Sequence, residues 1–132
     1  MRSRPALAVG STMPLRSIGP LTPTDIVRFA GAGGDFNPLH HVDSVARAAG
    51  FDGVIAMGQF QAAALAGALS DWAGVESVLR YEVRFASPWS AGETLDLSGE
   101  VTAAVDWVAE VQLSGAVGDR VVITGSARVA VA

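Results

Sequence analysis

The sequence predicts a single domain of the α+β class, in which a curled antiparallel β-sheet wraps around one central apolar helix. Two observations support this prediction: regular apolar–polar alternation through the second half, and one alanine-rich stretch that is apolar on nearly every side. The chain has 132 residues and is half hydrophobic, which suffices for one core. We expect one domain over residues 1–132, with a loose N-terminus over residues 1–10, because no linker or internal repeat interrupts the pattern.

Four stretches of the second half alternate apolar and polar residues. A period of two is typical of strands with one buried face, as in antiparallel sheets. Gly118-Asp119 separates the last two stretches and predicts a tight hairpin turn. A weaker pattern over Met13 to Ile18 predicts a first short strand. The alternating apolar positions are Leu79, Tyr81, Val83 and Phe85; Leu95, Leu97, Gly99 and Val101; Trp107, Ala109, Val111 and Leu113; and Val121, Ile123, Gly125, Ala127 and Val129.

The stretch from about Met57 to Trp72 has the length and alanine content of a helix. It has almost no polar face, and a helix that is apolar all round is a buried helix. It is too short to span a membrane, and it carries two glutamines. We therefore expect it to be the element that the strands cover.

Two shorter helices precede it. Thr22 as N-cap, Pro23 at the first helical position and Asp25 near the positive helix end form a good start signal. A second short helix is expected over residues 44–49, with Asp43 as its cap.

Composition limits the possible functions. The net charge of −4 argues against nucleic acid as a partner, because phosphate backbones require a positive surface. The chain has no cysteine and no lysine, which excludes disulfides, thiolate chemistry and a lysine Schiff base. The N-terminal apolar run is too short for a secretory signal, so we expect a cytoplasmic protein. The high apolar content favours a buried oligomer interface or an apolar ligand tunnel.

All imidazole chemistry must occur at His40 or His41, the only histidines. Asp35 lies five residues before His40, and the intervening Asn37-Pro38 step disfavours a helix. A carboxylate and an imidazole that converge can hold a water and move its proton near neutral pH. The alternative is that Asp35 only caps a turn and His40 is an ordinary loop residue. Adjacent histidines point apart, so no metal site is expected.

Several segments together resemble the signature of the MaoC-like, (R)-specific enoyl-thioester hydratases, over roughly residues 20–102. The most specific is the Asp-x-Asn-Pro-x-His core, whose spacing to Gly58 also fits the family without a gap. The segments that carry the resemblance are Gly34-Asp35-Phe36-Asn37-Pro38-Leu39-His40, Phe51, Ile55-Ala56-Met57-Gly58, Arg84-Phe85, and Pro88 through Gly92-Glu93-Thr94-Leu95.

The resemblance implies the hot-dog fold and a lyase that reversibly adds water to trans-2-enoyl thioesters, giving (3R)-3-hydroxyacyl thioesters. It implies no cofactor and no metal, and a thioester of coenzyme A or of acyl carrier protein as substrate. It also implies a homodimer, or a heteromer with another MaoC-like chain. Neither nucleic acid nor a membrane is an expected partner.

The resemblance also assigns roles. Asp35 is the expected base and His40 the residue that orients the water and relays its proton, although the pair titrates together and the division can be reversed. Asn37 is expected to brace the loop rather than touch substrate. The backbone amide of Gly58, at the start of the central helix, is the expected oxyanion donor. The alternative for Gly58 is a glycine needed only for backbone geometry.

The sequence departs from the family at two positions. An acidic residue usually follows the histidine by two positions, whereas Asp43 follows His40 by three. Met57 stands where the family commonly has histidine before the glycine, which affects the shape or polarity of the substrate pocket. Two other functions stay open: a non-catalytic subunit that supports an active partner, and a hot-dog acyl-thioester hydrolase. Many such hydrolases carry a carboxylate on the central helix, which here has none before Asp71.

Overall fold

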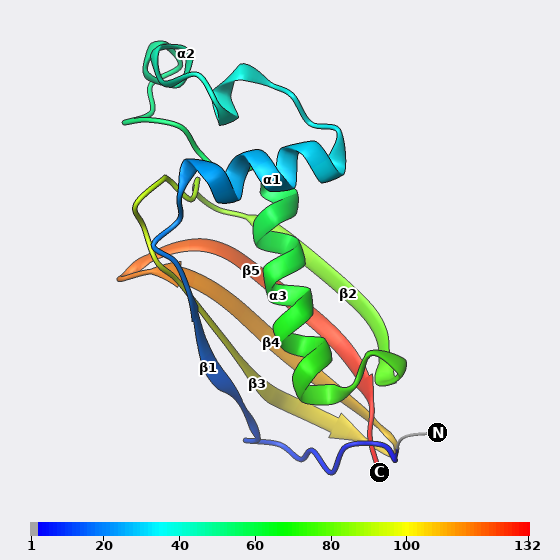
Figure 1. Cartoon of the computed structure of the whole chain (residues 1–132). Helices are drawn as coiled ribbons and strands as arrows, with labels where there is room; N and C mark the ends of the chain where they lie inside the picture. Colours follow the sequence, from blue (N-terminus) through cyan, green and yellow to red (C-terminus); the bar gives the residue numbers. More distant parts are fainter. Residues whose placement is uncertain (1–2) are drawn as a thin grey trace.

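A computed structural model describes residues 3–132 and shows one five-stranded antiparallel sheet that curls around a central helix. The helix, α3, lies across the concave face of the sheet, and α1 and α2 lie beyond its N-terminal end (Figure 1). The strand order is β1-β3-β4-β5-β2. This is the predicted hot-dog architecture. The elements are β1 Thr12–Ile18, α1 Pro23–Gly33, α2 Asp43–Ala48, α3 Gly58–Ala73, β2 Val78–Phe85, β3 Leu95–Val105, β4 Val108–Val117 and β5 Arg120–Ala130, with 3₁₀ turns at Pro38–His40 and Val75–Ser77.

The expected hairpin at Gly118-Asp119 is confirmed, because β4 ends at Val117 and β5 begins at Arg120. Gly118 has a φ of 57°, a left-handed conformation that glycine adopts at little cost. The β3–β4 hairpin turns at Asp106 and Trp107. Trp107 is half-exposed there and does not continue the buried alternation expected of it.

The core lies between α3 and the concave face of the sheet. Leu65 and Leu69 of α3 are buried against inward residues of the central strands. Gly125 of β5 faces this contact: a Cβ there would lie 3.4 Å from Leu65 and 3.1 Å from the carbonyl oxygen of Glu82. The glycine therefore allows the close approach of helix and sheet. The buried inward strand residues include Leu95, Leu97, Val101, Val111, Leu113, Ile123 and Val129.

The prediction that α3 is buried all round is wrong for one stripe. Gln59, Ala63, Gly67 and Asp71, spaced four residues apart, are exposed, because a single curled sheet covers only part of the helix circumference. The neighbouring edge strand β2 is also partly uncovered: Leu79 and Phe85, both expected to be buried, are 52% and 54% exposed.

The capping prediction holds for α1 and fails for α2. Thr22 and Asp25 form a reciprocal capping box, and hydrogen bonds from Thr22 hold the pKa of Asp25 below its ordinary value. In α2 the N-cap is Val42, not Asp43. Asp43 is instead the first helical residue, and its carboxylate accepts a hydrogen bond from Arg47 at 2.7 Å. An ion pair within the helix thus takes the place of the expected cap.

The N-terminal segment differs from the loose tail expected over residues 1–10, of which residues 1–2 lie outside the described part. The Pro5 carbonyl accepts a hydrogen bond from the amide of Ala132 at 3.0 Å. The Gly10 amide donates to Val101 of β3 at 2.9 Å. The guanidinium of Arg4 lies 5.2 Å from the centre of the Trp107 ring. These contacts hold the segment against the sheet.

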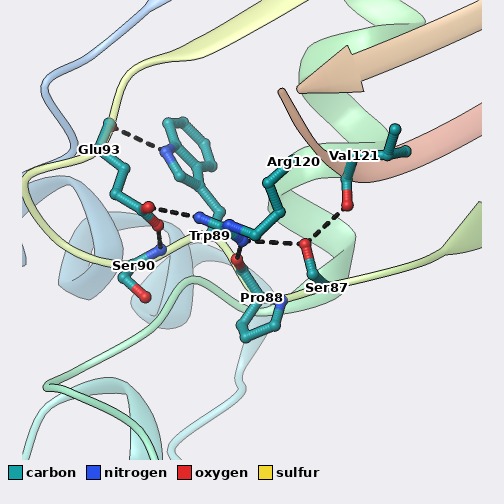
Figure 2. Close-up of polar contacts among 7 residues, drawn as sticks. All are labelled: Ser87, Pro88, Trp89, Ser90, Glu93, Arg120 and Val121. Atoms are coloured by element: carbon teal, nitrogen blue, oxygen red, sulfur yellow. Dashed lines mark hydrogen bonds and ion pairs between the residues drawn. The ribbon is translucent and has the colours of Figure 1, made fainter. Parts of the chain in front are cut away.

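A polar network around Arg120 joins the start of β5 to the loop between β2 and β3 (Figure 2). Arg120 donates to the Ser87 hydroxyl at 2.9 Å, to the Pro88 carbonyl at 2.7 Å, and to the carboxylate of Glu93. That carboxylate also accepts from the Ser90 amide at 2.8 Å. Partial burial raises the pKa of Glu93, but the hydrogen bonds and the charge of Arg120 outweigh burial, so the pKa lies below its ordinary value of 4.5.

This network predicts a pH-dependent loss of stability in Glu93→Gln. At pH values above 4.5 the carboxylate is ionised in the folded and unfolded chains, and wild type should keep its full advantage over the variant. As the pH falls below 4.5, the unfolded chain takes up the proton first and the advantage should shrink. Urea unfolding of both proteins across this range measures the difference. Glu100→Gln, an exposed change on β3, is the control, and an equally pH-dependent loss there would contradict the assignment.

Candidate active site

The loop after α1 carries Asp35 and is held by backbone geometry. Gly34 has a φ of 73° and ends α1 in a left-handed cap. The Asp35 amide then donates to the Ala30 carbonyl at 3.1 Å. The amide of Asn37 donates to Asp35 Oδ1 at 3.3 Å, and the Asn37 side chain accepts from the Leu39 amide at 3.0 Å. Asn37 thus caps the 3₁₀ turn that contains His40, a bracing contact of the expected kind.

The fold brings Asp35 and His40 together. His40 Nε2 lies 3.4 Å from Asp35 Oδ2. The histidine is 7% exposed, whereas the Asp35 side chain is 46% exposed. His40 Nδ1 lies 2.8 Å from the carbonyl oxygen of Ile55. A carbonyl oxygen only accepts, so Nδ1 carries the hydrogen, and Nε2 of the neutral ring presents its lone pair to Asp35.

The position of Ile55 depends on contacts between distant segments. Its amide donates to the Leu39 carbonyl at 3.4 Å, and it forms an isolated antiparallel bridge with Ser90. The next amide, of Ala56, donates to the Trp89 carbonyl at 2.8 Å. The loop that Arg120 holds therefore also fixes the carbonyl that orients His40.

Three aromatic rings fix the same loop against the helices. The rings of Phe29 and Phe60 stack at 4.8 Å, and Phe60 meets Trp89 edge-on at 5.3 Å. Trp89 is fully buried, and its indole donates to the Glu93 carbonyl at 2.9 Å. Packing of this kind limits the movement of the backbone that surrounds the pair.

The arrangement suits a water molecule between two acceptors. With the proton on Nδ1, neither His40 Nε2 nor the Asp35 carboxylate has a hydrogen to give the other. A water that donates one hydrogen to His40 Nε2 and the other to the Asp35 carboxylate pairs both acceptors. Its lone pairs then point away from the two side chains. If Nε2 is protonated instead, the two groups form a direct ion pair. The pair can therefore take a proton from a bound water and return it.

Gly58 is the first residue of α3, and the N-cap Met57 makes no side-chain hydrogen bond. The first amides of a helix have no partner within the helix and attract negative charge. The structure also supplies a packing reason for the glycine: a Cβ would lie 3.1 Å from the Phe85 ring. The missing side chain therefore admits the Phe85 ring. Met57 is buried.

A shallow hollow of about 280 Å³ lies beside Gly58. Neither Asp35 nor His40 lines it, and Ile55 connects it to the pair. Sequence reasoning missed two contributors. The Ile55 carbonyl has no side-chain signal, whereas Gln61 is one of the few polar residues in a largely apolar helix. The lining residues are Ile55, Ala56, Gly58, Gln61, Phe85, Ala86, Ser87 and Pro88.

His41 is exposed and takes no part in this arrangement. Within residues 3–132, no group of three or more histidine or acidic side chains is placed to hold a metal ion. No helix in the same range is long and apolar enough to cross a bilayer.

The relatives found by comparison with known proteins are named as hydratases or dehydratases. The chain is 33% identical over 120 residues to the 3-oxo-4,17-pregnadiene-20-carboxyl-CoA hydratase beta subunit of Mycobacterium tuberculosis, covering 88% of this chain and 92% of that protein. It is 44% identical over 68 residues to 3-hydroxyacyl-thioester dehydratase X of the same organism. That match covers 52% of this chain and only 24% of the longer relative.

Among solved structures, the (R)-hydratase from A. caviae involved in PHA biosynthesis superposes with a TM-score of 0.83 at 25% identity, covering 96% of this chain and 98% of that one. Residues 7–122 match the family described as the MaoC like domain. This match covers most of the 132 residues and contains Asp35, His40 and Gly58. The chain therefore belongs to the MaoC-like dehydratase family.

Proposed function

We propose that this chain reversibly hydrates trans-2-enoyl thioesters to (3R)-3-hydroxyacyl thioesters, with Asp35 and His40 holding the reacting water. The observation that carries the proposal is the hydrogen bond from His40 Nδ1 to the Ile55 carbonyl, at 2.8 Å. It sets the tautomer that leaves an acceptor facing the Asp35 carboxylate 3.4 Å away. Family relatives named as hydratases and dehydratases support the same reaction.

In the hydration direction, the water oxygen forms a bond to C3 of the enoyl group as one of its protons passes to the pair. Electrons of the C2–C3 double bond shift toward the thioester carbonyl, which becomes enolate-like. The pair then delivers the proton to C2 on the same face. Asp35 is the proposed base, and His40 orients the water and shares the proton.

The developing charge on the thioester oxygen needs a donor. We assign this role to the amide of Gly58, where the first turn of α3 favours negative charge. The assignment needs only the backbone N–H, so Met57 in place of the family's common histidine does not remove the donor. Met57 instead shapes the adjoining pocket.

Acyl-thioester hydrolysis is the less favoured reaction. On α3 the first carboxylate is Asp71, near the far end of the helix, where it pairs with Arg16 at 2.7 Å. It lies some thirteen residues from Gly58, about 20 Å along the helix axis. A carboxylate so far from the proposed thioester site cannot serve as its base.

We also propose that the chain acts as an assembly, with a second copy or with another MaoC-like chain. In the single chain, solvent reaches the exposed stripe of α3. It also reaches the apolar side chains of Leu79 and Phe85 on edge strand β2. The hollow beside Gly58 is shallow and does not enclose an acyl group by itself. One relative is named as a beta subunit. The substrate carrier is proposed to be coenzyme A or acyl carrier protein.

Asp35→Asn and His40→Ala should each lower the hydration rate by at least about a hundredfold, because each removes half of a positioned acid–base pair. Crotonyl-CoA and longer trans-2-enoyl-CoA substrates report hydration through the loss of enoyl absorbance, while a thiol assay detects hydrolysis. His41→Ala is the control: it removes the exposed histidine next to His40 and should keep wild-type activity. Thiol release that exceeds hydration would favour the hydrolase.

Gly58→Pro should separate the role of the amide from that of packing. Proline is well tolerated at the first helical position, and Met57 already has the extended backbone that precedes proline. Proline removes the N–H, whereas Gly58→Ala keeps it and adds a similar clash with Phe85. The kcat of Gly58→Pro should be about 10²- to 10³-fold below that of Gly58→Ala. Equal rates in the two variants would exclude the amide as an oxyanion donor.

Ala63→Arg should disrupt the assembly without unfolding the chain, since Ala63 lies in the exposed stripe of α3. A buried, unpaired charge at an interface is strongly unfavourable. Light scattering after gel filtration should show the wild-type assembly reduced to single chains of 13.5 kDa. Val105→Arg, at the exposed β3–β4 hairpin, is the control. An unchanged mass for Ala63→Arg would place the interface elsewhere.

A further inference from the structure

Gln61 is a buried polar residue that the proposed reaction does not use. It is 2% exposed, and its Oε1 has no hydrogen-bond partner among residues 3–132. Most buried polar atoms in folded proteins are paired, and an unpaired one is costly. The unpaired Oε1 of Gln61 therefore indicates a hydrogen-bond donor from outside the described residues.

The position of Gln61 indicates where that partner lies. It follows Gly58 by three residues on α3, so both lie on one side of the helix, and both line the same hollow. Helical side chains lean toward the N-terminus, so the Gln61 carboxamide leans toward the turn that contains Gly58. The other lining side chains are mostly apolar: Ile55, Ala56, Phe85, Ala86 and Pro88. Gln61 is thus a polar group in a largely apolar hollow.

We propose that Gln61 is a specificity-determining residue, whose carboxamide hydrogen-bonds an oxygen of the acyl group beyond C3. The favoured substrates are then acyl thioesters that carry a hydroxyl or carbonyl oxygen there, in preference to plain alkyl chains. This inference rests on the proposed thioester substrate and adds its acyl class. The thioester carbonyl is placed at Gly58, which lines the hollow, and C3 must reach Asp35 and His40, which do not. We place the acyl group beyond C3 in the remainder of the hollow, beside Gln61.

The carboxamide can satisfy either oxygen class. Its Oε1 accepts from a hydroxyl, and rotation of the group by a half turn presents Nε2 as a donor to a carbonyl. A plain alkyl chain in the hollow leaves Oε1 unpaired, as it is in the free chain, whereas an oxygen-bearing chain supplies the missing hydrogen bond. Sites built to hydrogen-bond a substrate discriminate strongly against analogues that lack the polar group.

Saturated thioesters test the inference without requiring catalysis. Calorimetry should show that wild type binds 5-hydroxyhexanoyl-CoA or 5-oxohexanoyl-CoA about 5- to 100-fold more tightly than hexanoyl-CoA, the range expected for one buried polar group left unpaired. In Gln61→Met, which keeps the length of the side chain, the ratio should fall to about one. Gln112→Met, an exposed change on β4, should keep the wild-type ratio.

The inference would be overturned by the same ratio in wild type and Gln61→Met, by no preference in wild type, or by no binding of any of these thioesters. An equal loss of affinity for all three ligands would also overturn it, by assigning Gln61 to the carrier that they share. Thermal unfolding adds a second readout. Gln61→Met should be at least as stable as wild type, whereas a structural glutamine would leave the variant less stable.

Enoyl-CoA hydration by wild type, measured in parallel, tests the proposed function by itself. A binding preference without hydration would retain the role of Gln61 and reject the reaction. Hydration without a binding preference would retain the reaction and reject the role of Gln61.

Discussion

The hydrogen bond from His40 Nδ1 to the Ile55 carbonyl is the constraint on which the candidate site depends. It fixes which ring nitrogen carries the proton, and so which nitrogen faces Asp35. The carbonyl is itself fixed by the bridge between Ile55 and Ser90. Arg120, from a third part of the chain, holds the loop that contains Ser90. The proposed chemistry thus rests on a backbone contact supported by segments far apart in sequence.

The geometry of one sheet around one helix accounts for the incompleteness of the single chain. The sheet covers the side of α3 that carries Leu65 and Leu69, and leaves the stripe from Gln59 to Asp71 exposed. The hollow lies elsewhere, where the start of α3 meets Phe85 and the segment that follows β2. Phe85 is exposed on edge strand β2 and also lines the hollow, so an assembly that covers β2 would link the proposed interface to the proposed substrate site.

Gly58 shows how one residue can meet two requirements. The absent side chain is explained by the close approach of the Phe85 ring, and the proposed catalytic role uses only the amide. The sequence motif alone cannot separate these requirements, because one glycine supplies both the backbone amide and the space for Phe85. Gln61 is the opposite case: no packing requirement explains it, and its unpaired oxygen directs attention to a ligand.

The sequence by itself determined the strands, the central helix and the Thr22 N-cap, since these follow from local periodicity and cap chemistry. The pairing of Asp35 with His40 was expected from the resemblance to the MaoC-like family, because their spacing alone also fits an ordinary turn. It did not determine that Val42 caps α2, that Leu79 and Phe85 are exposed, or that Ile55 orients His40. Those features depend on which segments meet across the fold. A backbone carbonyl has no residue-specific signal, and the exposure of an edge strand depends on what covers it, so only the tertiary structure decided them.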